Sequence, residues 1–381
     1  MPTDNPIYLD NNATTPVLPE VVEAMLPHLR EHFGNPSSSH AFGRRSRAAV
    51  DEARAQVAML LGCASDEIVF TSGGTESNNL ALRGVTERVT RRREVVTSII
   101  EHPAVAAPCG WLERQGWRVT RVAVGRDGRV SVEKVTESIG AGTALVTVMH
   151  SNNETGVLQP IEAIARAAHG EGALVHTDAA QSVGKIRVDV RTLDVDLLSI
   201  AGHKLYAPKG VGALYVRRGT PLTPFTLGAG HEFGLRPGTE NVAGIVGLGA
   251  ACEMARQSLA AAGSGMSTLR DRLWKRLSEQ VPGLVLNGHI EERLPNTLNV
   301  CFPDVSGTAL LAATPQIAAS TGSACHDGNE SPSAVLLAMG VPAEQAIGSV
   351  RLTLGRSTTD EEIERAAEAL SRAWGGLVAS A

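Results

Sequence analysis

ALVHTDAAQSVGKIRVDVRTLDVDLLSIAGHKLYAPKGVGALYV, residues 173–216, contains three short runs rich in apolar and β-branched residues, at 173–176, 196–200 and 212–216. Runs of the same kind occur upstream at 67–70, 95–99 and 144–148. Between the runs, apolar residues recur at three- and four-residue spacing over 50–60, 103–114 and 161–169. That spacing is typical of helices with one buried face. The alternation predicts an α/β fold, in which helices cover a mostly parallel central sheet.

The pattern changes after a helix-like stretch at 241–262. Strand-like runs follow at 284–286, 296–300 and 350–354, with helix-like stretches near 267–280, 332–339 and 359–373. These predict a smaller α+β domain at the C-terminal end. The run AAAGSG at 260–265 fits either a flexible joint or an ordinary surface loop. We predict a large domain at 16–255 and a small domain formed by 1–15 and 256–381.

The composition excludes several classes of function. Lys plus Arg number 35 and Asp plus Glu 40 in 381 residues, and a net charge of -5 gives no field that would attract a nucleic acid. No apolar run approaches the roughly 18 residues of a membrane span, and the first residues resemble no signal peptide. The five cysteines are scattered without CxxC spacing, which favours a reducing compartment. We therefore expect a cytoplasmic protein that binds neither membrane nor nucleic acid.

Lys204 is placed like a catalytic amine, because it follows an apolar run and lies between Gly202 and Pro208. A partly desolvated lysine loses its proton more readily and can attack a carbonyl carbon. Asp178 follows another apolar run, and a carboxylate there needs a cationic partner such as a pyridinium nitrogen. Gln181, three residues later, could reach the phenolic oxygen of the same ring. The alternative is that Asp178 caps the next helix.

Two further segments carry candidate chemistry. FTSGGTE at 70–76 passes from a strand through small residues to a helix-like run, so backbone N–H groups and the Thr75 hydroxyl could bind a phosphate. The alternative is an ordinary turn. Cys325 lies beside His326 in a polar, glycine-containing loop, where a thiolate could form. An inert loop cysteine is the alternative, and no second ligand pair supports a metal site there. The other four cysteines have apolar neighbours, as expected of core residues: Cys63, Cys109, Cys252 and Cys301.

Taken together, the motifs resemble those of the pyridoxal-phosphate-dependent cysteine desulfurases of the NifS/IscS type, within the class V aminotransferase group of fold-type I enzymes. The resemblance covers nearly the whole chain. Its motifs are YLDNNATTP (8–16), GNPSS (34–38), TSGGTESN (71–78), EHP (101–103), NNETG (152–156), HTDAAQ (176–181), GHK (202–204), RPGTEN (236–241), GSAC (322–325) and RLTLGR (351–356).

The resemblance implies conversion of L-cysteine to L-alanine, with the sulfur transferred to Cys325 as a persulfide and then delivered to an acceptor protein. The acceptor would be a scaffold of iron–sulfur cluster assembly or a thiolation enzyme. Lys204 would bind pyridoxal 5'-phosphate covalently, Asp178 would pair with the pyridine nitrogen, and His102 would stack on the ring and assist proton transfer. No metal is implied.

The remaining site residues are also implied by the resemblance. The phenolic oxygen would be held by Gln181 and Asn153, and the phosphate by Thr75, His203, the Gly74 backbone and Thr239 of a second subunit, which makes a homodimer with a shared site. Arg351 would bind the substrate carboxylate, assisted by Asn35 or Asn12, with Arg356 as a weaker candidate.

Two departures from the family pattern affect these expectations. Ala201 stands where a serine often adds a hydrogen bond to the phosphate, so one contact worth roughly 0.5–1.5 kcal/mol should be missing. The run HDGNE at 326–330 replaces small residues usual after the cysteine, which affects the choice of acceptor. Other class V activities are alternatives: an aminotransferase, a selenocysteine lyase or an epimerase. A non-catalytic assembly partner is a further alternative, disfavoured by intact Lys204, Asp178 and His102.

Overall fold

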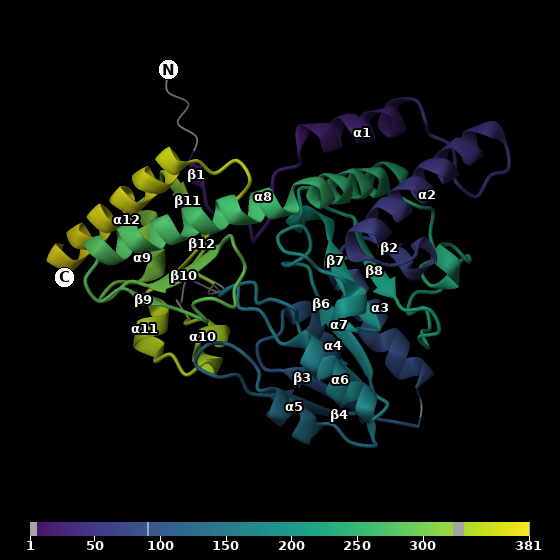
Figure 1. Ribbon diagram of the computed structural model, residues 1–381, viewed down its shortest axis with the longest axis horizontal. Helices are drawn as coiled ribbons and strands as arrows, with labels where there is room; N and C mark the ends of the chain where they lie inside the picture. The colour runs from purple at the N-terminus through teal and green to yellow at the C-terminus, as the bar shows by residue number, and fades with distance from the viewer. Residues whose placement is uncertain (1–5, 90, 323–330, 381) are drawn as a thin grey trace.

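The computed structural model describes residues 6–89, 91–322 and 331–380, and its centre is a seven-stranded sheet in the order β2-β8-β7-β6-β5-β3-β4 (Figure 1). The strands are β2 (Ile68–Thr71), β3 (Glu94–Ser98), β4 (Arg118–Val122), β5 (Thr143–Thr147), β6 (Leu174–Asp178), β7 (Leu197–Ala201) and β8 (Gly212–Val216). Strands β3 to β7 pair in parallel, and β8 is antiparallel to both β7 and β2. The predicted α/β fold with a mostly parallel sheet is confirmed.

Strand β8 runs in the opposite direction because of its short connection to β7. Only residues 202–211 separate the two strands, which is too short for the crossover that a parallel neighbour requires. The sequence prediction omitted edge strand β4, RVTRV, in which Arg118 and Arg121 are exposed and only Val122 is fully buried, so the run lacks the apolar character of the inner strands.

Helices cover both faces of this sheet. They are α1 (Pro19–Arg30), α2 (Ala41–Leu61), α3 (Gly74–Arg88), α4 (Pro103–Arg114), α5 (Val132–Ser138), α6 (Ile161–Gly170) and α7 (Val190–Leu193). Successive strand residues point to opposite faces, so Val95 and Leu145 pack with α3 and α4, whereas Val96 and Val146 pack in a second core with α2 and α6. Two covered faces explain why nearly every residue of the strands other than β4 is buried, polar ones included.

The N-terminal strand joins the C-terminal part of the chain. Strand β1 (Ile7–Tyr8) pairs in parallel with β11 (Ile317–Ala318), and a three-stranded antiparallel sheet has the order β12-β10-β9. Its strands are β9 (Val285–Leu286), β10 (Thr297–Cys301) and β12 (Ser349–Thr353), and the helices of this part are α9 (Gly307–Ala312), α10 (Ala334–Ala338), α11 (Ala343–Ile347) and α12 (Asp360–Ser380). Leu9, Leu298, Leu352 and Ile363 belong to its separate core.

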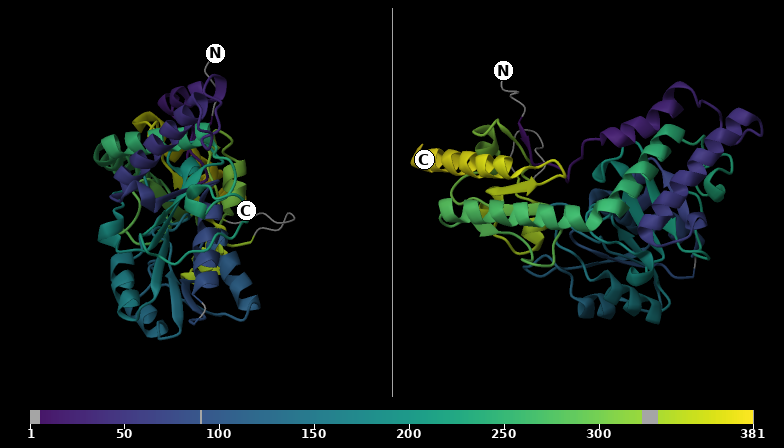
Figure 2. Two further views of the ribbon diagram at one scale, coloured as in Figure 1. Left: turned by 90° about the vertical axis from the view of Figure 1, so that its right-hand side faces the viewer. Right: turned by 45° about the horizontal axis from the view of Figure 1, so that its top comes forward.

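Residues 260–265 are neither a flexible joint nor a loop, so both readings of this run were wrong. They lie inside α8 (Val242–Gln280), a single 39-residue helix that extends from the large sheet to the small one (Figure 2). Alanine has the highest helix propensity, and packing along both ends of the helix outweighs the roughly 1 kcal/mol cost of each glycine. The proposed domain division at 255/256 stays a prediction.

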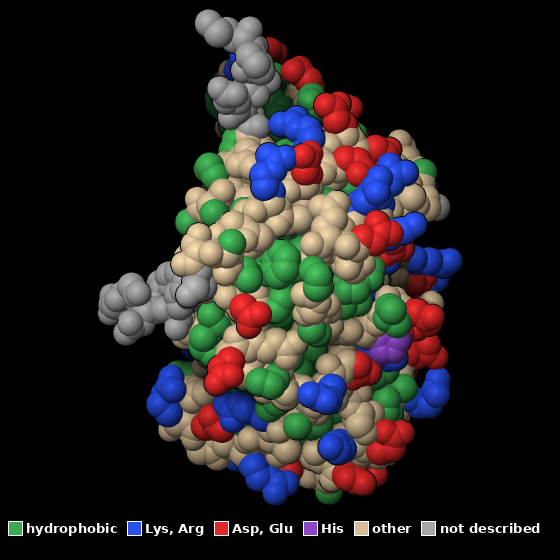
Figure 3. Space-filling model, turned by 90° about the vertical axis from the view of Figure 1, so that its left-hand side faces the viewer, with side chains coloured by type: hydrophobic (Ala, Val, Ile, Leu, Met, Phe, Trp, Pro, Cys, Tyr) green, Lys and Arg blue, Asp and Glu red, His purple; other side chains and the backbone are tan. Residues whose placement is uncertain are grey.

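Acidic and basic side chains are interspersed on the face of the molecule in Figure 3. The small negative net charge is therefore not gathered into one field on that face. Within the described part of the chain, every helix is too short or too polar to cross a lipid bilayer.

Candidate active site

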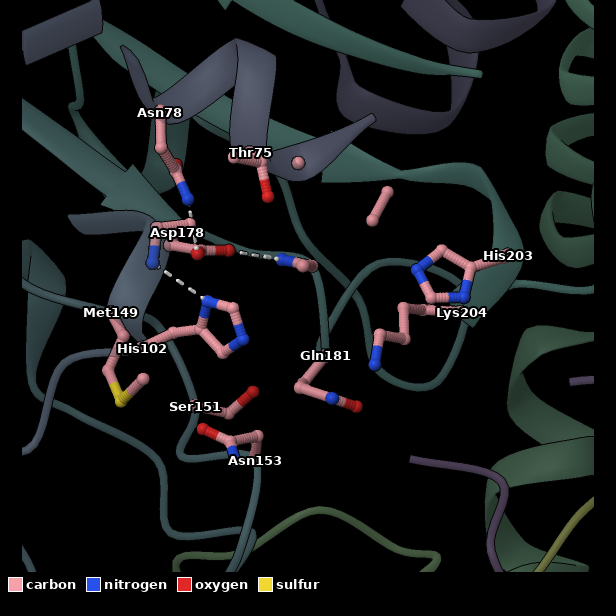
Figure 4. A pocket seen from close by; sticks show the side chains of 14 residues that line it. Thr75, Asn78, His102, Met149, Ser151, Asn153, Asp178, Gln181, His203 and Lys204 are labelled. Carbon is pink, nitrogen blue, oxygen red and sulfur yellow. Dashed lines mark hydrogen bonds between the residues drawn. The ribbon is translucent and has the colours of Figure 1, made fainter. Parts of the chain in front are cut away.

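A cavity of about 180 Å³ lies at the carboxyl ends of the central strands, the usual place for a ligand in an open α/β sheet. Figure 4 shows the side chains that point into it. The lining residues come from the start of α3, the segments after β3 and β5, and the ends of β6 and β7: Gly74, Thr75, Asn78, His102, Ala104, Met149, Ser151, Asn153, Asp178, Ala180, Gln181, Ala201, His203 and Lys204. Eight of the predicted site residues therefore meet at one cavity.

Asp178 is the last residue of β6 and is 7% exposed. Its Oδ2 accepts a hydrogen bond from Asn78 Nδ2 at 2.7 Å, and its Oδ1 accepts one from the Ala180 backbone N–H at 2.9 Å. The alternative that Asp178 caps the next helix is wrong, because that helix, α7, begins only at Val190 and has Asp189 as its N-cap. Across residues 6–89, 91–322 and 331–380, no lysine, arginine or histidine forms an ion pair with this carboxylate. A buried carboxylate that faces a cavity without a counter-ion is suited to a cationic ligand group.

Lys204 follows β7 and enters the same cavity from the opposite side (Figure 4). Its Nζ donates hydrogen bonds to the carbonyl oxygens of Asn12, at 2.5 Å, and Ala13, at 3.0 Å. Burial and the nearby Arg351 guanidinium lower the pKa of Lys204 to about 8, although Asp178 acts in the opposite direction. A pKa of about 8 leaves far more of this amine uncharged near neutral pH than the ordinary value of 10.5 does, and the uncharged form is the one that attacks a carbonyl carbon.

His102 is the N-cap of α4, and its Nδ1 accepts a hydrogen bond from the Ala104 backbone N–H at 3.1 Å. Burial lowers the pKa of His102; Asp178 opposes the shift and Lys204 reinforces it. The neutral ring then carries its proton on Nε2, which the capping bond leaves free.

The phosphate-binding corner predicted from the sequence is formed by the start of α3. Gly73, directly before the helix, has φ of +148°, and a Cβ placed there would meet no atom within 4 Å. Gly74 and Thr75 then present the first turn of a 15-residue helix to the cavity, where backbone N–H groups attract an anion. His203 lies at the same end, and burial together with Lys204 lowers its pKa to about 4. Ala201 lines the cavity without any hydrogen-bonding side chain.

None of the predicted substrate residues lines the cavity. Arg351, on β12, is 7% exposed; its Nη2 lies 2.8 Å from Asp10 Oδ1, and its Nη1 donates to the Asn153 carbonyl at 3.0 Å. Asn12 is buried, with both ends of its side-chain amide hydrogen-bonded inside the protein. Asn35 is exposed on the α1–α2 connection. Arg356 places its guanidinium 5.2 Å from the Tyr206 ring centre.

Thr239 is exposed and does not line the cavity of its own chain. Cys325 and the segment 326–330 lie outside the described residues.

Cys109, Cys252 and Cys301 are buried as predicted, whereas Cys63 is only partly buried. Burial raises the pKa of the Cys63, Cys109 and Cys252 thiols to about 12, so none of these three is a thiolate at neutral pH.

Asn78 is a site residue that the sequence analysis missed. It is 1% exposed and orients Asp178 through the 2.7 Å hydrogen bond. The sequence contained a signal for this role. Asn78 follows Gly74 by four residues and Thr75 by three, and this spacing places all three on the same face of α3. Ser151 was also missed, although it precedes the predicted Asn153 by two residues.

Comparisons with known proteins show the family of this chain. The family model described as "Aminotransferase class-V" matches residues 7–366. A cysteine desulfurase of Trichormus azollae is 47% identical over 366 residues, which cover 96% of this chain and 92% of that protein. A solved NifS-like protein superposes with a TM-score of 0.92 at 38% identity, covering 98% of this chain and 100% of that one. The solved structure "SspA in complex with cysteine" superposes with a TM-score of 0.81 at 36% identity, covering 92% and 99%. The chain belongs to the class V aminotransferase family.

Proposed function

We propose that the protein is a pyridoxal-phosphate-dependent cysteine desulfurase, which converts L-cysteine to L-alanine and transfers the sulfur to its own Cys325. The observation that carries this proposal is the pair of groups on opposite sides of one cavity. Asp178 is a buried carboxylate without a counter-ion, and Lys204 is an amine whose pKa is lowered to about 8. The names of the relatives agree with the proposed reaction.

The residues present fit the proposed cofactor. The Asp178 carboxylate matches a protonated pyridine nitrogen, because the described chain supplies it with two neutral donors and no cation. The start of α3 matches the phosphate, with Gly74, Thr75 and His203 as its partners. Lys204 would bind the aldehyde carbon covalently, His102 would stack on the ring, and Gln181 and Asn153 would hold the phenolic oxygen.

When bound, the cofactor supplies an electron sink for the substrate carbon that loses its proton. The protein supplies the proton transfers. Lys204, once released by the substrate amine, takes the proton from the substrate Cα, which its low pKa allows near neutral pH. His102, neutral and with a free Nε2–H, lies on the same side of the cavity as Asp178 (Figure 4) and assists the return of a proton.

The substrate carboxylate would be bound by Arg351, whose charge acts on Lys204. Its Nε has no hydrogen-bond partner among the described residues, and its Nη2 pairs with Asp10. An incoming carboxylate would take the place of Asp10 or share the guanidinium with it.

Cys325 would attack the substrate sulfur. The new S–S bond leaves a persulfide on Cys325, and the electron pair of the broken C–S bond passes to the carbon that is protonated to form alanine. Gly322 and Ser333 lie on either side of the segment that carries Cys325, and both are close to Glu154. Ser333 Oγ donates to Glu154 Oε2 at 2.5 Å, and a Cβ on Gly322 would lie 2.6 Å from the same oxygen. Glu154 adjoins Asn153 of the cavity, which supports delivery of the thiol to this site.

The proposal includes a homodimer in which Thr239 completes the phosphate site of the second subunit, and an acceptor protein that takes the persulfide sulfur. Exposed Thr239 and the exposed, stacked pair Phe33 and Phe42 support a second copy as a partner. The cytoplasmic location stays a prediction from the sequence.

The test is sulfur release by the purified protein loaded with pyridoxal phosphate. We expect L-alanine and sulfide in equal amounts from L-cysteine in the presence of a reductant. Cys325→Ala should bind the cofactor and L-cysteine with unchanged visible spectra yet release no sulfur. Cys252→Ala, at a buried and protonated thiol, is the matched control and should retain full activity. Undiminished sulfide release by Cys325→Ala would contradict the proposal.

A further inference from the structure

A second buried lysine lies behind the cavity. Lys185 follows β6 in the chain, is 4% exposed, and donates hydrogen bonds from Nζ to Gln181 Oε1 at 2.9 Å and to Asn12 Oδ1 at 3.1 Å. Within the three described ranges, no carboxylate lies within ion-pairing distance of this amine. A lysine is rarely buried in this way, so its position requires an explanation.

The surroundings of Lys185 suit an uncharged amine. Burial, together with the charges of Lys204 and Arg351, lowers its pKa well below the ordinary value. A neutral amine has two N–H bonds, and the two amide oxygens accept both of them. A structural role alone would be served better by an apolar side chain of the same volume, which would bury no polar group.

The two acceptors of Lys185 are the residues that shape one side of the cavity. With Oε1 bound to Lys185, the Gln181 amide must turn its NH₂ group away, and that group donates to the Asn12 carbonyl at 2.9 Å. The second hydrogen of the NH₂ group remains for a ligand in the cavity, which Gln181 lines.

Asn12 connects the same lysine to the reactive amine. Its side-chain Oδ1 accepts from Lys185 and from Asn296 Nδ2, the latter at 3.1 Å, and its Nδ2 donates to Thr297 Oγ1 at 2.9 Å. Its backbone carbonyl accepts from Lys204 Nζ at 2.5 Å. The side chain is thus held at both ends while the backbone carbonyl holds Lys204.

We propose that Lys185 is a positioning residue for this site, which fixes the Gln181 amide with its NH₂ group toward the cofactor and holds Asn12 where its carbonyl orients Lys204. The inference rests on the proposed function for the identity of the ligand. Lys185 itself touches neither cofactor nor substrate; it acts through two residues that line or border the cavity.

The test compares Lys185→Met with wild type and with Gln181→Leu. Methionine keeps the length of the stem and removes the donor. We expect Lys185→Met to weaken pyridoxal phosphate binding roughly tenfold, as loss of one oriented hydrogen bond would, and to shift the visible absorption maximum of the bound cofactor in the same direction as Gln181→Leu. The double variant should be less impaired than the sum of the two single effects, because Lys185→Met acts on the cofactor partly through Gln181.

Two further variants separate positioning from general stability. Arg270→Met removes a buried charged side chain, 9% exposed on α8 and not among the residues that line the cavity, and should lower the unfolding midpoint without moving the spectrum. Lys185→Gln keeps an NH₂ donor group on a shorter side chain and should fall between wild type and Lys185→Met. It replaces Lys185→Met in the test if that variant does not fold. In a crystal structure of cofactor-free Lys185→Met, the Gln181 amide should have rotated.

A wild-type spectrum and wild-type affinity in Lys185→Met would overturn the inference, as would effects of Lys185→Met and Gln181→Leu that simply add. Failure of the wild-type protein to bind pyridoxal phosphate would refute the proposed function instead, so the two failures are distinguishable.

Discussion

The carboxylates of Asp178 and Glu232 are equally buried, each 7% exposed as a residue, but they have opposite surroundings. Glu232 receives both Nη groups of Arg54 at 2.7 Å and the Phe70 backbone N–H at 2.8 Å. Asp178 receives two neutral donors and faces a cavity. A buried charge with a complete set of protein partners is part of the folded structure itself, whereas a buried charge without a counter-ion can bind a charged ligand group.

The largest effect in this comparison is expected on the cavity side, at Lys204. Lys204→Ala removes both the amine that would bind the cofactor and the group that would take the substrate proton. Turnover of L-cysteine should fall on the order of 10⁴-fold or more, since general acid–base catalysis alone contributes up to about that factor. The measurement is alanine formation under saturating cofactor, with Lys209→Ala, a nearby lysine outside the cavity, as the control. Activity of Lys204→Ala within tenfold of wild type would contradict the assignment.

At the Arg54–Glu232 ion pair, substitution should lower the free energy of unfolding. Arg54→Met leaves Glu232 buried with only backbone support, which costs about 3–5 kcal/mol of unfolding free energy. Urea unfolding of the cofactor-free protein measures this loss. Glu232→Gln should cost less than Arg54→Met, because the amide oxygen still accepts from Arg54 and no buried anion remains. A loss below about 1 kcal/mol in Arg54→Met would mean that this pair is not a stabilising element.

Asp178→Asn, unlike Arg54→Met, should lower turnover and leave the stability of the cofactor-free protein unchanged. The uncharged amide cannot keep a ring nitrogen protonated, and removing one member of a buried charge pair costs about 2–5 kcal/mol, so turnover should fall on the order of 10²-fold. Unfolding free energy of the cofactor-free variant should equal that of wild type within about 1 kcal/mol, because no ion pair is lost. The experiment combines steady-state kinetics with urea unfolding. Strong destabilisation with intact turnover would place Asp178 in the same class as Glu232.

The residues that line the cavity were largely predictable because local sequence carries their signal. Asp178 ends a strand, Lys204 and Thr75 follow strands within a few residues, and parallel strands bring their carboxyl ends to one edge. The reversal of β8 was also implicit in the length of its connection. The proposed role of Lys185 was not predictable from local sequence, because it depends on a contact with Asn12, 173 residues away.

The continuous helix α8 and the Arg54–Glu232 pair were not predictable for a related reason. The AAAGSG run at 260–265 has two glycines, and only packing on other elements decides that it is helical. Arg54 and Glu232 are 178 residues apart, and nothing in either segment marks its partner. Local patterns predict strands, turns and groups at strand ends, whereas contacts between distant segments require the folded chain.

The smallest expected effect is on the pH dependence of stability, and it compares Lys204 in the cavity with the Arg54–Glu232 pair. The pKa of Lys204 is lowered to about 8 in the folded chain from 10.5, so the unfolded chain binds more protons between these values and wild-type stability gains with rising pH there. Lys204→Met lacks the penalty of burying this charge. It should therefore be more stable than wild type below pH 8, with the advantage shrinking as the pH rises toward 10.5.

Urea unfolding of the cofactor-free proteins at pH 7 and pH 9.5 measures this difference, and taking the difference between variants cancels the other titrating groups. Lys209→Met, at a lysine that does not line the cavity, is the matched control. An advantage of Lys204→Met that stayed constant from pH 7 to 9.5 would mean that the Lys204 ammonium is as well accommodated in the fold as the Arg54 guanidinium beside Glu232. In that case the contrast between the cavity and the Arg54–Glu232 pair would hold for the carboxylates Asp178 and Glu232 but not for the Lys204 amine.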